Sequence, residues 1–221
     1  MKVIITGTTG MIGKGVLLEC LEHDEVSEVL SITRSSLNLD HPKLVKLIHK
    51  DFSEFSSVGA RLRGYDACFA CMGVSAAGLD EDTYKLRTYD FTMALAEVLL
   101  KTNKEMTFIY VSGQGTDSSE KGRSMWARIK GKTENDLLKL GFGQAYMFRP
   151  GGILPGKGIK PSNKLYRRAL FWLGWLLRVI KFFSPKSIVS TRQIGRAMIN
   201  ITLKGSNRSI INPVDIQILA K

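Results

Sequence analysis

Three glycines near the start of the chain have the spacing of a phosphate-binding turn. Gly7, Gly10 and Gly13 follow a short apolar run and open an amphipathic stretch of helical period. The first permits a sharp turn, the second lets the backbone approach a pyrophosphate, and the third lets the helix pack closely on a sheet. The unpaired N–H groups of the helix would face the phosphates. The loop therefore predicts a dinucleotide site formed by Gly7, Thr8, Thr9, Gly10, Met11, Ile12 and Gly13.

Arg34 stands at the end of the second predicted strand, where dinucleotide-binding folds distinguish NAD from NADP. An acidic residue there binds the ribose hydroxyls of NAD, whereas a basic residue accommodates the extra phosphate of NADP. Residues 31–36 contain no carboxylate. Arg34 can pair bidentately with a phosphate, and Thr33, Ser35 and Ser36 add hydroxyl donors. We expect NADP(H) as the cofactor; the alternative is that Arg34 is an exposed loop residue.

The elements that must position these residues alternate between strands and helices. Strands are expected over residues 1–6, 28–33, 46–49, 67–70, 107–112 and 144–148. Helices are expected over residues 14–22, 83–102, 124–140 and 191–203, and a last extended segment over residues 209–219. This alternation implies parallel strands joined by crossovers. The predicted fold class is α/β, a Rossmann doubly wound parallel sheet of about seven strands with a small C-terminal helical cap.

A single domain is expected for the whole chain. Its 221 residues, 44% of them hydrophobic, and its mean hydropathy of −0.02 are typical of a globular protein that buries a substantial core. Within this NAD(P)-binding Rossmann domain, residues 1–155 would form the dinucleotide-binding core. Residues 156–221 would form the C-terminal cap and the last strand.

Several short motifs, in order along the chain, resemble those of the short-chain dehydrogenase/reductase superfamily. They are the glycine loop, Cys71-Met72-Gly73, Val111-Ser112, Lys130-Gly131-Lys132-Thr133-Glu134 and Phe148-Arg149-Pro150-Gly151. More narrowly, the chain resembles the atypical branch that holds the Tat-interacting metastasis-suppressor-like oxidoreductases and NAD-dependent epimerase/dehydratase-like proteins. The resemblance implies an NADP(H)-binding oxidoreductase or epimerase-like protein that acts on a small carbonyl or hydroxyl substrate.

The same resemblance implies further contacts to the cofactor. It places Asp51 and Phe52, after the third strand, near the adenine, and the loop Cys71-Met72-Gly73 beneath the ribose. It brings Pro150, Gly151 and Ile153 close to the nicotinamide end.

The catalytic position departs from the superfamily pattern, which typically has Tyr-x-x-x-Lys on one helix face and a Ser or Thr at the end of a preceding strand. Residues four apart face the same way on a helix, so the lysine lowers the tyrosine pKa and holds the ribose while the tyrosine transfers the substrate proton. By resemblance Lys130 and Ser112 match this pattern, but Trp126 stands at the tyrosine position. An indole N–H cannot serve as a general acid at accessible pH. The candidate catalytic residues are Ser112, Trp126 and Lys130, and Lys130 is also a cofactor ligand.

Two functions remain open on these residues. In the first, the protein is an NADP(H)-dependent reductase or epimerase-like enzyme whose proton comes from Ser112, Thr116, a water molecule or another tyrosine such as Tyr84. In the second, it is a catalytically silent NADP(H)-binding regulatory or scaffold protein. We favour the enzyme slightly, because hydride chemistry belongs largely to the cofactor.

The net charge of +12 favours an anionic partner. Basic residues and aromatics interleave between Lys157 and Lys186, and an almost entirely apolar helix is expected there. Its apolar run, of about 22 Å, is too short to cross roughly 30 Å of hydrocarbon. We expect a lid, core or homodimer helix, with peripheral membrane contact through residues 165–183 as the alternative. Nucleic acid is not expected, because no recognised binding module is present.

The cysteine and histidine content points away from disulfides and metals. Three cysteines are too few for a disulfide framework and no secretory signal opens the chain, so we expect a cytoplasmic protein, with peripheral membrane association as the alternative. Cys68 and Cys71 have the spacing of a redox pair, but on a strand they point to opposite faces, so we expect buried apolar roles for them. His23, His41 and His49 are far apart and expected at the surface, so no metal site is predicted.

Overall fold

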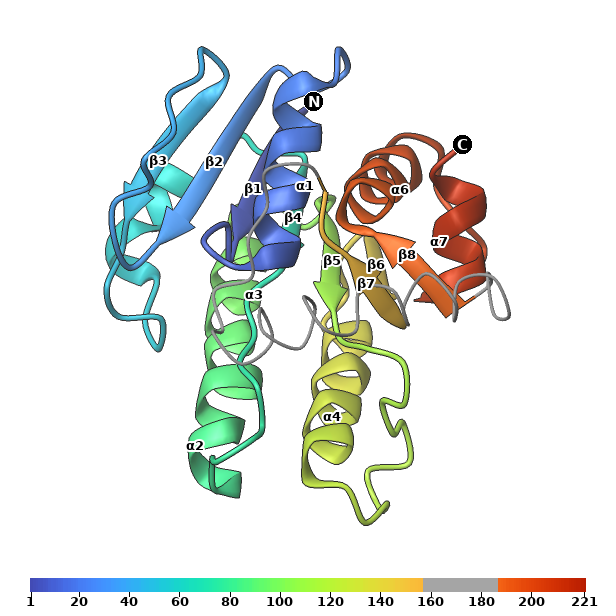
Figure 1. Cartoon of the computed structure of the whole chain (residues 1–221). Helices are drawn as coiled ribbons and strands as arrows, with labels where there is room; N and C mark the ends of the chain where they lie inside the picture. The colour runs from blue at the N-terminus through green and yellow to red at the C-terminus, as the bar shows by residue number, and fades with distance from the viewer. Residues whose placement is uncertain (157–186) are drawn as a thin grey trace.

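A parallel seven-stranded sheet forms the centre of the protein (Figure 1). The computed structural model describes residues 1–156 and 187–221. The strand order is β3-β2-β1-β4-β5-β6-β9, and every neighbouring pair is parallel. The strands are β1 (Lys2–Thr6), β2 (Glu28–Thr33), β3 (Leu44–Ile48), β4 (Ala67–Ala70), β5 (Thr107–Val111), β6 (Gln144–Phe148) and β9 (Ile210–Ile211). The predicted doubly wound fold is confirmed.

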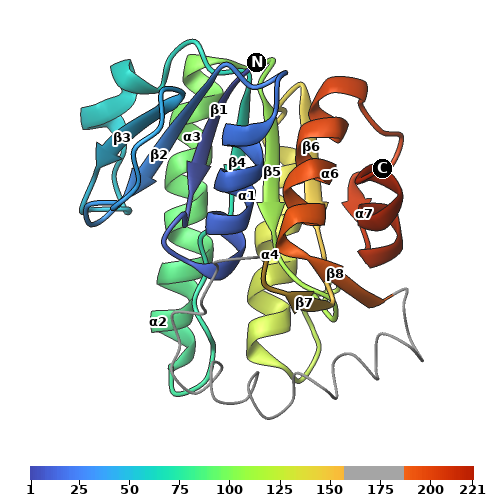
Figure 2. The same ribbon diagram turned by 45° about the horizontal axis from the view of Figure 1, so that its top comes forward.

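Helices cover both faces of the sheet. In Figure 2, α1 (Met11–Glu22) and α6 (Thr191–Lys204) lie in front of the sheet, and α3 (Phe91–Thr102) and α4 (Met125–Lys139) lie behind it. One apolar core joins Val3 and Ile5 of β1 to α1 and α6, whereas Ile4 joins the core beneath α3 and α4. Alternate residues of one strand thus enter opposite cores, and this explains why β4 and β5 are buried along their whole length.

The chain reverses its direction of travel across the sheet between β1 and β4. It runs from β1 outward to β2 and β3, and then returns to place β4 on the other side of β1. In open parallel sheets a crevice forms at the carboxyl ends of the strands where the order reverses, and ligands bind there. The glycine loop follows β1 at this point.

The predicted helix over residues 83–102 consists of three segments. A short helix α2 (Glu81–Lys85) is followed by one wide turn of π-helix, η2 (Leu86–Asp90), and then by α3. Asp80 caps α2, since its carboxylate accepts a hydrogen bond from the Thr83 N–H at 2.7 Å. Wide turns of this kind are frequent at functional sites, because they shift the facing of the side chains that follow.

The structure corrects the expected extended segment over residues 209–219. Only Ile210–Ile211 pairs with β6, and Pro213–Leu219 forms the helix α7. Pro213 opens this helix, and Asn212 and Asp215 cap it reciprocally, so its start carries two strong helix signals. A small parallel sheet of β7 (Gly152–Leu154) and β8 (Ile188–Ser190) was also not expected from the sequence. The 3-10 helix η1 (Ser56–Leu62) completes the described elements.

His49 is buried, so its expected surface position is wrong. Its Nε2 lies 2.6 Å from the carbonyl oxygen of Glu54, and its ring centroid lies 4.8 Å from that of Phe55. The imidazole packs as part of an aromatic cluster with Phe52 and Phe55. His23 and His41 are half-buried.

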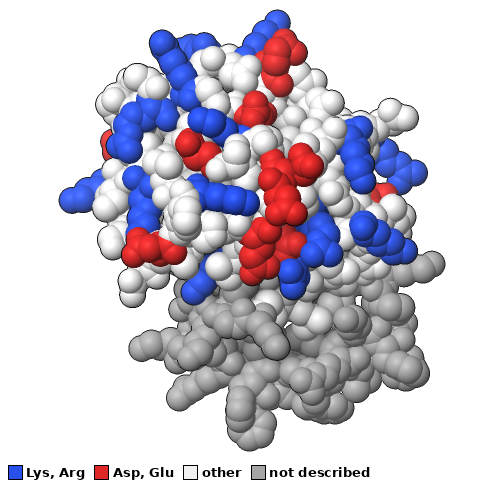
Figure 3. Space-filling view, turned by 90° about the horizontal axis from the view of Figure 1, so that it is seen from above, with Lys and Arg blue, Asp and Glu red and all other residues white. Residues whose placement is uncertain are grey.

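The basic and aromatic segment 157–186, with the apolar helix expected in it, lies outside the described residues. On the face shown in Figure 3, basic and acidic side chains of the described part are interspersed. Within the described residues, no helix has both the length and the apolar character needed to cross a membrane.

Candidate functional site

The glycine loop is built by two close backbone contacts. Gly7 has a positive φ of 72°, and a Cβ atom there would lie 2.5 Å from the carbonyl oxygen of Cys71. A Cβ on Gly13 would lie 2.2 Å from the carbonyl oxygen of Gly7. Any side chain at these two positions would force the turn away from α1 or from the loop after β4. The backbone atoms next to Gly13 belong to Gly7 and Thr8 of the turn, so the absence of a Cβ lets α1 pack closely against the turn.

In the first turn of α1, no acidic side chain competes with a bound anion for the backbone N–H groups. No acidic residue lies in this turn, and no side chain caps its start at Gly10. The Gly10 N–H itself is satisfied by the Gly7 carbonyl at 2.9 Å. The free donors and the positive end of the helix dipole favour an anion such as a pyrophosphate. The turn therefore fits the diphosphate of a dinucleotide.

Beside this loop lies a cavity of about 340 Å³, which we call the glycine-loop cavity. It reaches from the glycine turn to the ends of β2 and β4 and to the wide turn η2. Its lining residues are Gly7, Thr9, Gly10, Ile32, Thr33, Arg34, Phe52, Cys71, Met72, Gly73, Val74, Arg87 and Phe91. Of the residues predicted for the cofactor, this cavity is lined by Gly7, Thr9, Gly10, Arg34, Phe52 and the loop Cys71-Met72-Gly73.

Among the described residues that line the glycine-loop cavity, two are arginines and none carries a carboxylate. Arg34 comes from the end of β2 and Arg87 from η2, and both side chains are exposed to solvent. Asp51, predicted near the adenine, is not among the lining residues. Its carboxylate accepts hydrogen bonds from the N–H and hydroxyl of Ser53, which hold its pKa below the usual value. The cavity therefore suits a ligand with several negative charges.

A second cavity of about 700 Å³, here the lysine cavity, adjoins the first through Val74, which lines both. It lies between the ends of β4 and β5, the start of α4 and the residues after β6. Its lining residues are Ile12, Val74, Ser75, Ala76, Ala77, Tyr84, Ser112, Gly113, Gln114, Gly115, Trp126, Lys130, Pro150, Gly151 and Ile153. The residues predicted for the nicotinamide end, Pro150, Gly151 and Ile153, are in this set, and so are Ser112, Trp126 and Lys130.

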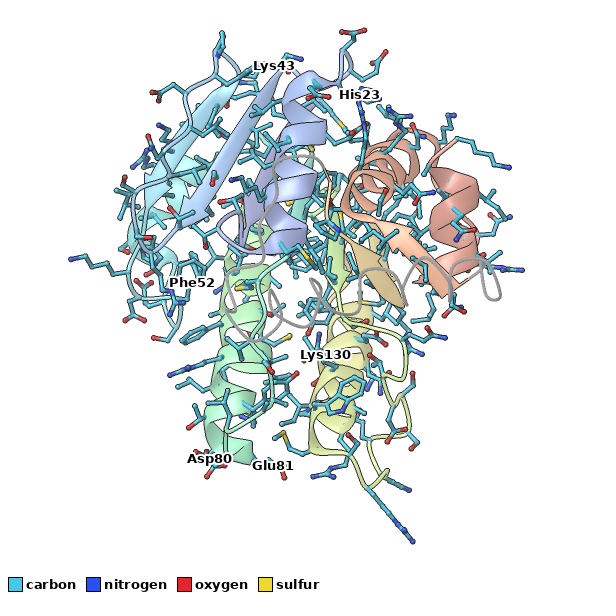
Figure 4. The ribbon with its side chains drawn as sticks, viewed as in Figure 1. His23, Lys43, Phe52, Asp80, Glu81 and Lys130 are labelled. Atoms are coloured by element: carbon cyan, nitrogen blue, oxygen red, sulfur yellow. The ribbon has the colours of Figure 1, made fainter. Side chains whose placement is uncertain are left out.

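Lys130 extends from α4 to the end of β5. Its ammonium donates a hydrogen bond of 2.5 Å to the carbonyl oxygen of Ser112. Burial lowers the pKa of Lys130 to about 8, and the nearby carboxylate of Glu134 opposes this shift. In Figure 4, Lys130 lies between the α3 and α4 ribbons. Phe52 and Lys130 lie toward one end of the strands of the sheet, and His23 and Lys43 lie toward the other end.

Ser112 lines the cavity, and its hydroxyl is hydrogen-bonded to acceptors of the protein itself. The Oγ lies 2.5 Å from a Glu134 oxygen and 3.1 Å from the carbonyl oxygen of Phe148, and both are acceptors. Glu134 is fully buried and accepts hydrogen bonds from both Nε and Nη2 of Arg149, and this Nη2 also donates to Ser118. The carboxylate of Glu134 therefore connects Ser112 with Arg149. This hydrogen-bond network joins the end of β5, α4 and the end of β6.

The remaining candidate proton donors differ in their surroundings. Trp126 is half-buried, and its ring lies 3.3 Å from the position a Cβ would take on Gly115. Tyr84 is 1% exposed, and burial raises its pKa. Thr116 donates its hydroxyl proton to the carbonyl oxygen of Gly113 at 2.7 Å and does not line the cavity.

The cysteines have no redox partner in the described residues. Cys20, Cys68 and Cys71 are free thiols, and Cys68 and Cys71 contact the cores on opposite faces of the sheet. Burial raises the pKa of all three thiols. Among the described residues no cluster of His, Cys, Asp and Glu has the arrangement of a metal site.

The fold and the two adjoining cavities define an NAD(P)-binding α/β protein of the Rossmann type. Residues 3–122 match the NAD dependent epimerase/dehydratase family. Because this match spans more than half of the 221 residues, the chain belongs to that family.

Proteins of known name and structure are similar to the chain over most of its length. It is 26% identical over 216 residues to the protein fmp52, mitochondrial, of Emericella nidulans, covering 95% of this chain and 90% of that protein. It is 27% identical over 155 residues to HTATIP2 of Rattus norvegicus, covering 69% and 63% of the two chains. These relatives support the predicted atypical short-chain dehydrogenase/reductase family.

Two solved structures share the fold. A short-chain dehydrogenase/reductase family oxidoreductase from Burkholderia thailandensis aligns with a TM-score of 0.72 and 14% identity, covering 100% of this chain and 93% of that chain. The enzyme WbmF of Bordetella bronchiseptica, solved with NAD+, aligns with a TM-score of 0.69 and 15% identity, covering 99% and 76%.

The comparison overturns the expected cytoplasmic location. The fmp52 proteins of Emericella nidulans, Meyerozyma guilliermondii and Saccharomyces cerevisiae are all named as mitochondrial. The expectation rested on cysteine content and on the lack of a secretory signal, and neither property distinguishes the cytoplasm from the interior of a mitochondrion.

Sequence reasoning missed Arg87 and Gln114. Arg87 reaches the glycine-loop cavity from the wide turn η2, which is hidden inside a continuous helical pattern. Gln114 lines the lysine cavity and donates its backbone N–H to the Pro150 carbonyl oxygen at 2.9 Å. The position of Gln114 two residues after the predicted strand end was the available signal for it.

Proposed function

We propose that this protein binds NADP(H) and uses it to reduce a small carbonyl compound, or to oxidise the corresponding alcohol. The observation that carries this proposal is the pair of adjoining cavities at the carboxyl edge of the sheet. One contains the glycine turn and two arginines, and the other contains Lys130. Family membership supports a nicotinamide dinucleotide as the cofactor.

The choice of NADP(H) rests on the charge of the glycine-loop cavity. Arg34 stands where NAD-specific folds carry an acidic residue, and Arg87 adds a second guanidinium from another element. In the part of the chain that the structure describes, no acidic residue lines this cavity. Arginine forks match the geometry of a phosphate, so we assign the 2′-phosphate to these two side chains.

The lysine cavity would hold the nicotinamide end and the substrate. When bound, the cofactor supplies a hydride to the carbonyl carbon. Ile12, Pro150 and Ile153 give this cavity apolar walls that exclude water from the reacting atoms. Lys130 holds the ribose and provides positive charge where the oxygen becomes negative.

Cofactor preference tests the first half of the proposal. We expect NADPH to bind with higher affinity than NADH, as measured by calorimetry. Arg34→Ala should weaken NADPH about 10-fold to 100-fold, the loss expected for one charge-assisted phosphate contact, and leave NADH unchanged. Arg87→Ala should act in the same direction. Arg61→Ala removes an exposed arginine outside both cavities and is the matched control.

A second function, NADP(H) binding without turnover, is favoured by one observation. Trp126 occupies the helix position of the usual tyrosine, and the Ser112 hydroxyl is hydrogen-bonded to Glu134. A protein of this kind would respond to the redox state of the cofactor pool. NADPH absorbance followed with a panel of aldehydes, ketones and quinones separates the two functions. Oxidation of NADPH by any of these carbonyls contradicts the silent function, and flat traces throughout contradict the reductase.

A further inference from the structure

We propose that Lys130 itself donates the proton to the carbonyl oxygen, in the role that a tyrosine usually fills. This inference rests on the proposed reductase function and assigns the chemical step within it. The position of its ammonium in the lysine cavity, one helical turn from Trp126, carries the inference.

Only two side chains lining the described part of the lysine cavity ionise, Lys130 and Tyr84. Tyr84 lies 1% exposed, and loss of its proton would leave a buried phenolate beside Tyr110. The hydroxyl proton of Ser112 is directed to Glu134. Among the described residues that line the cavity, the ammonium is therefore the remaining donor, and it leaves a neutral amine, which burial favours.

The hydrogen bonding of Lys130 is compatible with donation. An ammonium has three N–H donors, and one of them is used by the Ser112 carbonyl oxygen at 2.5 Å. That bond anchors the side chain at the end of β5, and the other two donors have no partner among the described residues, so they can serve a ligand of the cavity.

Burial and a neighbouring carboxylate shift the pKa of Lys130 in opposite directions. Glu134, one turn further along α4, favours the charged form, but its carboxylate is already paired with Arg149 from the end of β6. Tyr84 faces the cavity from α2, and the more distant pairs of α4, Arg128 with Glu81 and Lys132 with Asp136, lie toward solvent. Burial prevails, so the pKa of Lys130 falls to about 8, close to the pH at which general acids work best.

The step is balanced in atoms and electrons. As hydride adds to the carbonyl carbon, the π-electron pair of the C=O bond moves to oxygen. One N–H bond of the Lys130 ammonium breaks and an O–H bond forms, which gives the alcohol and a neutral amine. The amine then takes a proton from water. The substrate gains two electrons, and these come from the reduced cofactor.

The pH dependence of kcat/KM for carbonyl reduction tests the proposal. We expect a plateau below pH 8 and a tenfold fall per pH unit above it, because the protonated amine is required. Lys130→Arg keeps a cation that cannot release its proton, so it should lower kcat about 10²-fold to 10⁴-fold and remove this limb, with NADPH affinity little changed. Lys132→Arg makes the same substitution on α4 outside both cavities, so it is the matched control and should keep the limb.

Trp126→Tyr tests the same assignment by rescue. Adding this tyrosine to Lys130→Arg should restore at least about tenfold of the lost kcat, since a phenol then supplies the proton. An independent readout is the Lys130 ¹³Cε chemical shift in the labelled, ligand-free protein, assigned by its loss in Lys130→Arg. The change of this chemical shift with pH should have its midpoint at about pH 8.

Three results would overturn the proposal. They are an unchanged limb in Lys130→Arg, an NMR midpoint above about 10, the value of an unperturbed lysine, and a wild-type protein that binds NADPH yet reduces no carbonyl while Trp126→Tyr does. In each case cofactor binding stands. Loss of NADPH binding in the wild-type protein would instead contradict the proposed function.

Discussion

At the scale of single residues, the buried network around Glu134 explains why several motifs of the sequence occur together. The serine at the end of β5, the glutamate of α4 and the arginine after β6 are separated by up to 37 positions, yet they share one carboxylate. Because Glu134 is fully buried, its charge is tolerable only with both donors in place. Ser112 thus has a structural partner that competes with any catalytic use of its hydroxyl.

Ser112→Ala should therefore lower stability more than catalysis. The buried carboxylate of Glu134 loses one donor, and we expect the free energy of unfolding to fall by about 1–3 kcal/mol. The backbone carbonyl that anchors Lys130 is unchanged, so kcat/KM should fall less than about tenfold. Urea unfolding and steady-state kinetics on the same preparation measure both quantities. A loss of activity of 100-fold or more at unchanged stability would show that Ser112 acts in the chemistry.

At the scale of elements, the glycine turn and α1 depend on each other for their position. Gly13 lies in the first turn of the helix, and the Gly7 carbonyl occupies the space that a Cβ would need. The turn can present its N–H groups to a phosphate only while this contact is kept.

Gly13→Ala should thus weaken both the fold and the binding of NADPH. A Cβ 2.2 Å from the Gly7 oxygen must displace the backbone, at a cost of about 1–3 kcal/mol in unfolding free energy. We also expect NADPH affinity to fall by more than tenfold, since the turn moves with the helix. The control is Gly59→Ala, whose Cβ would make an ordinary contact of 3.6 Å with Val98. Equal behaviour of the two variants would contradict the role given to Gly13.

Local sequence patterns predicted most of the elements, and the exceptions share a physical cause. The six longer strands of the main sheet are rich in apolar residues, and the glycine turn carries its own motif. The wide turn η2 changes the helical register without changing the apolar pattern. The sequence therefore predicted neither this turn nor the position of Arg87 in the glycine-loop cavity. The strands β7 and β8 are three residues each and are far apart in the sequence. Local sequence patterns therefore could not predict that they pair.

At the scale of the whole molecule, the C-terminal part packs onto the N-terminal helix. Arg192 and Arg196 of α6 both bind the carboxylate of Glu19 in α1, at 2.8 and 3.0 Å. The Glu19 side chain is 5% exposed, whereas Arg192 and Arg196 are 61% and 43% exposed, so the carboxylate is buried and its two partners reach it from the surface. The nearby contact of Glu22 with Arg192 joins the same helices, but its side chains are 66% and 61% exposed.

We therefore predict that residues 1–156 and 187–221 unfold as one cooperative unit, as a single domain requires. Glu19→Ala removes the buried carboxylate that both arginines bind, and since the two guanidinium groups left behind can be hydrated, it should lower the unfolding free energy by about 1–3 kcal/mol. The matched variant Glu22→Ala breaks only an exposed pair and should cost about 0–1 kcal/mol. Urea unfolding by circular dichroism gives these values, and hydrogen exchange of α1 and α6 should report the same opening free energy. Earlier opening of α6 in the wild-type protein would mean that the C-terminal part is a separate unit, since a shared core forces both helices to exchange together.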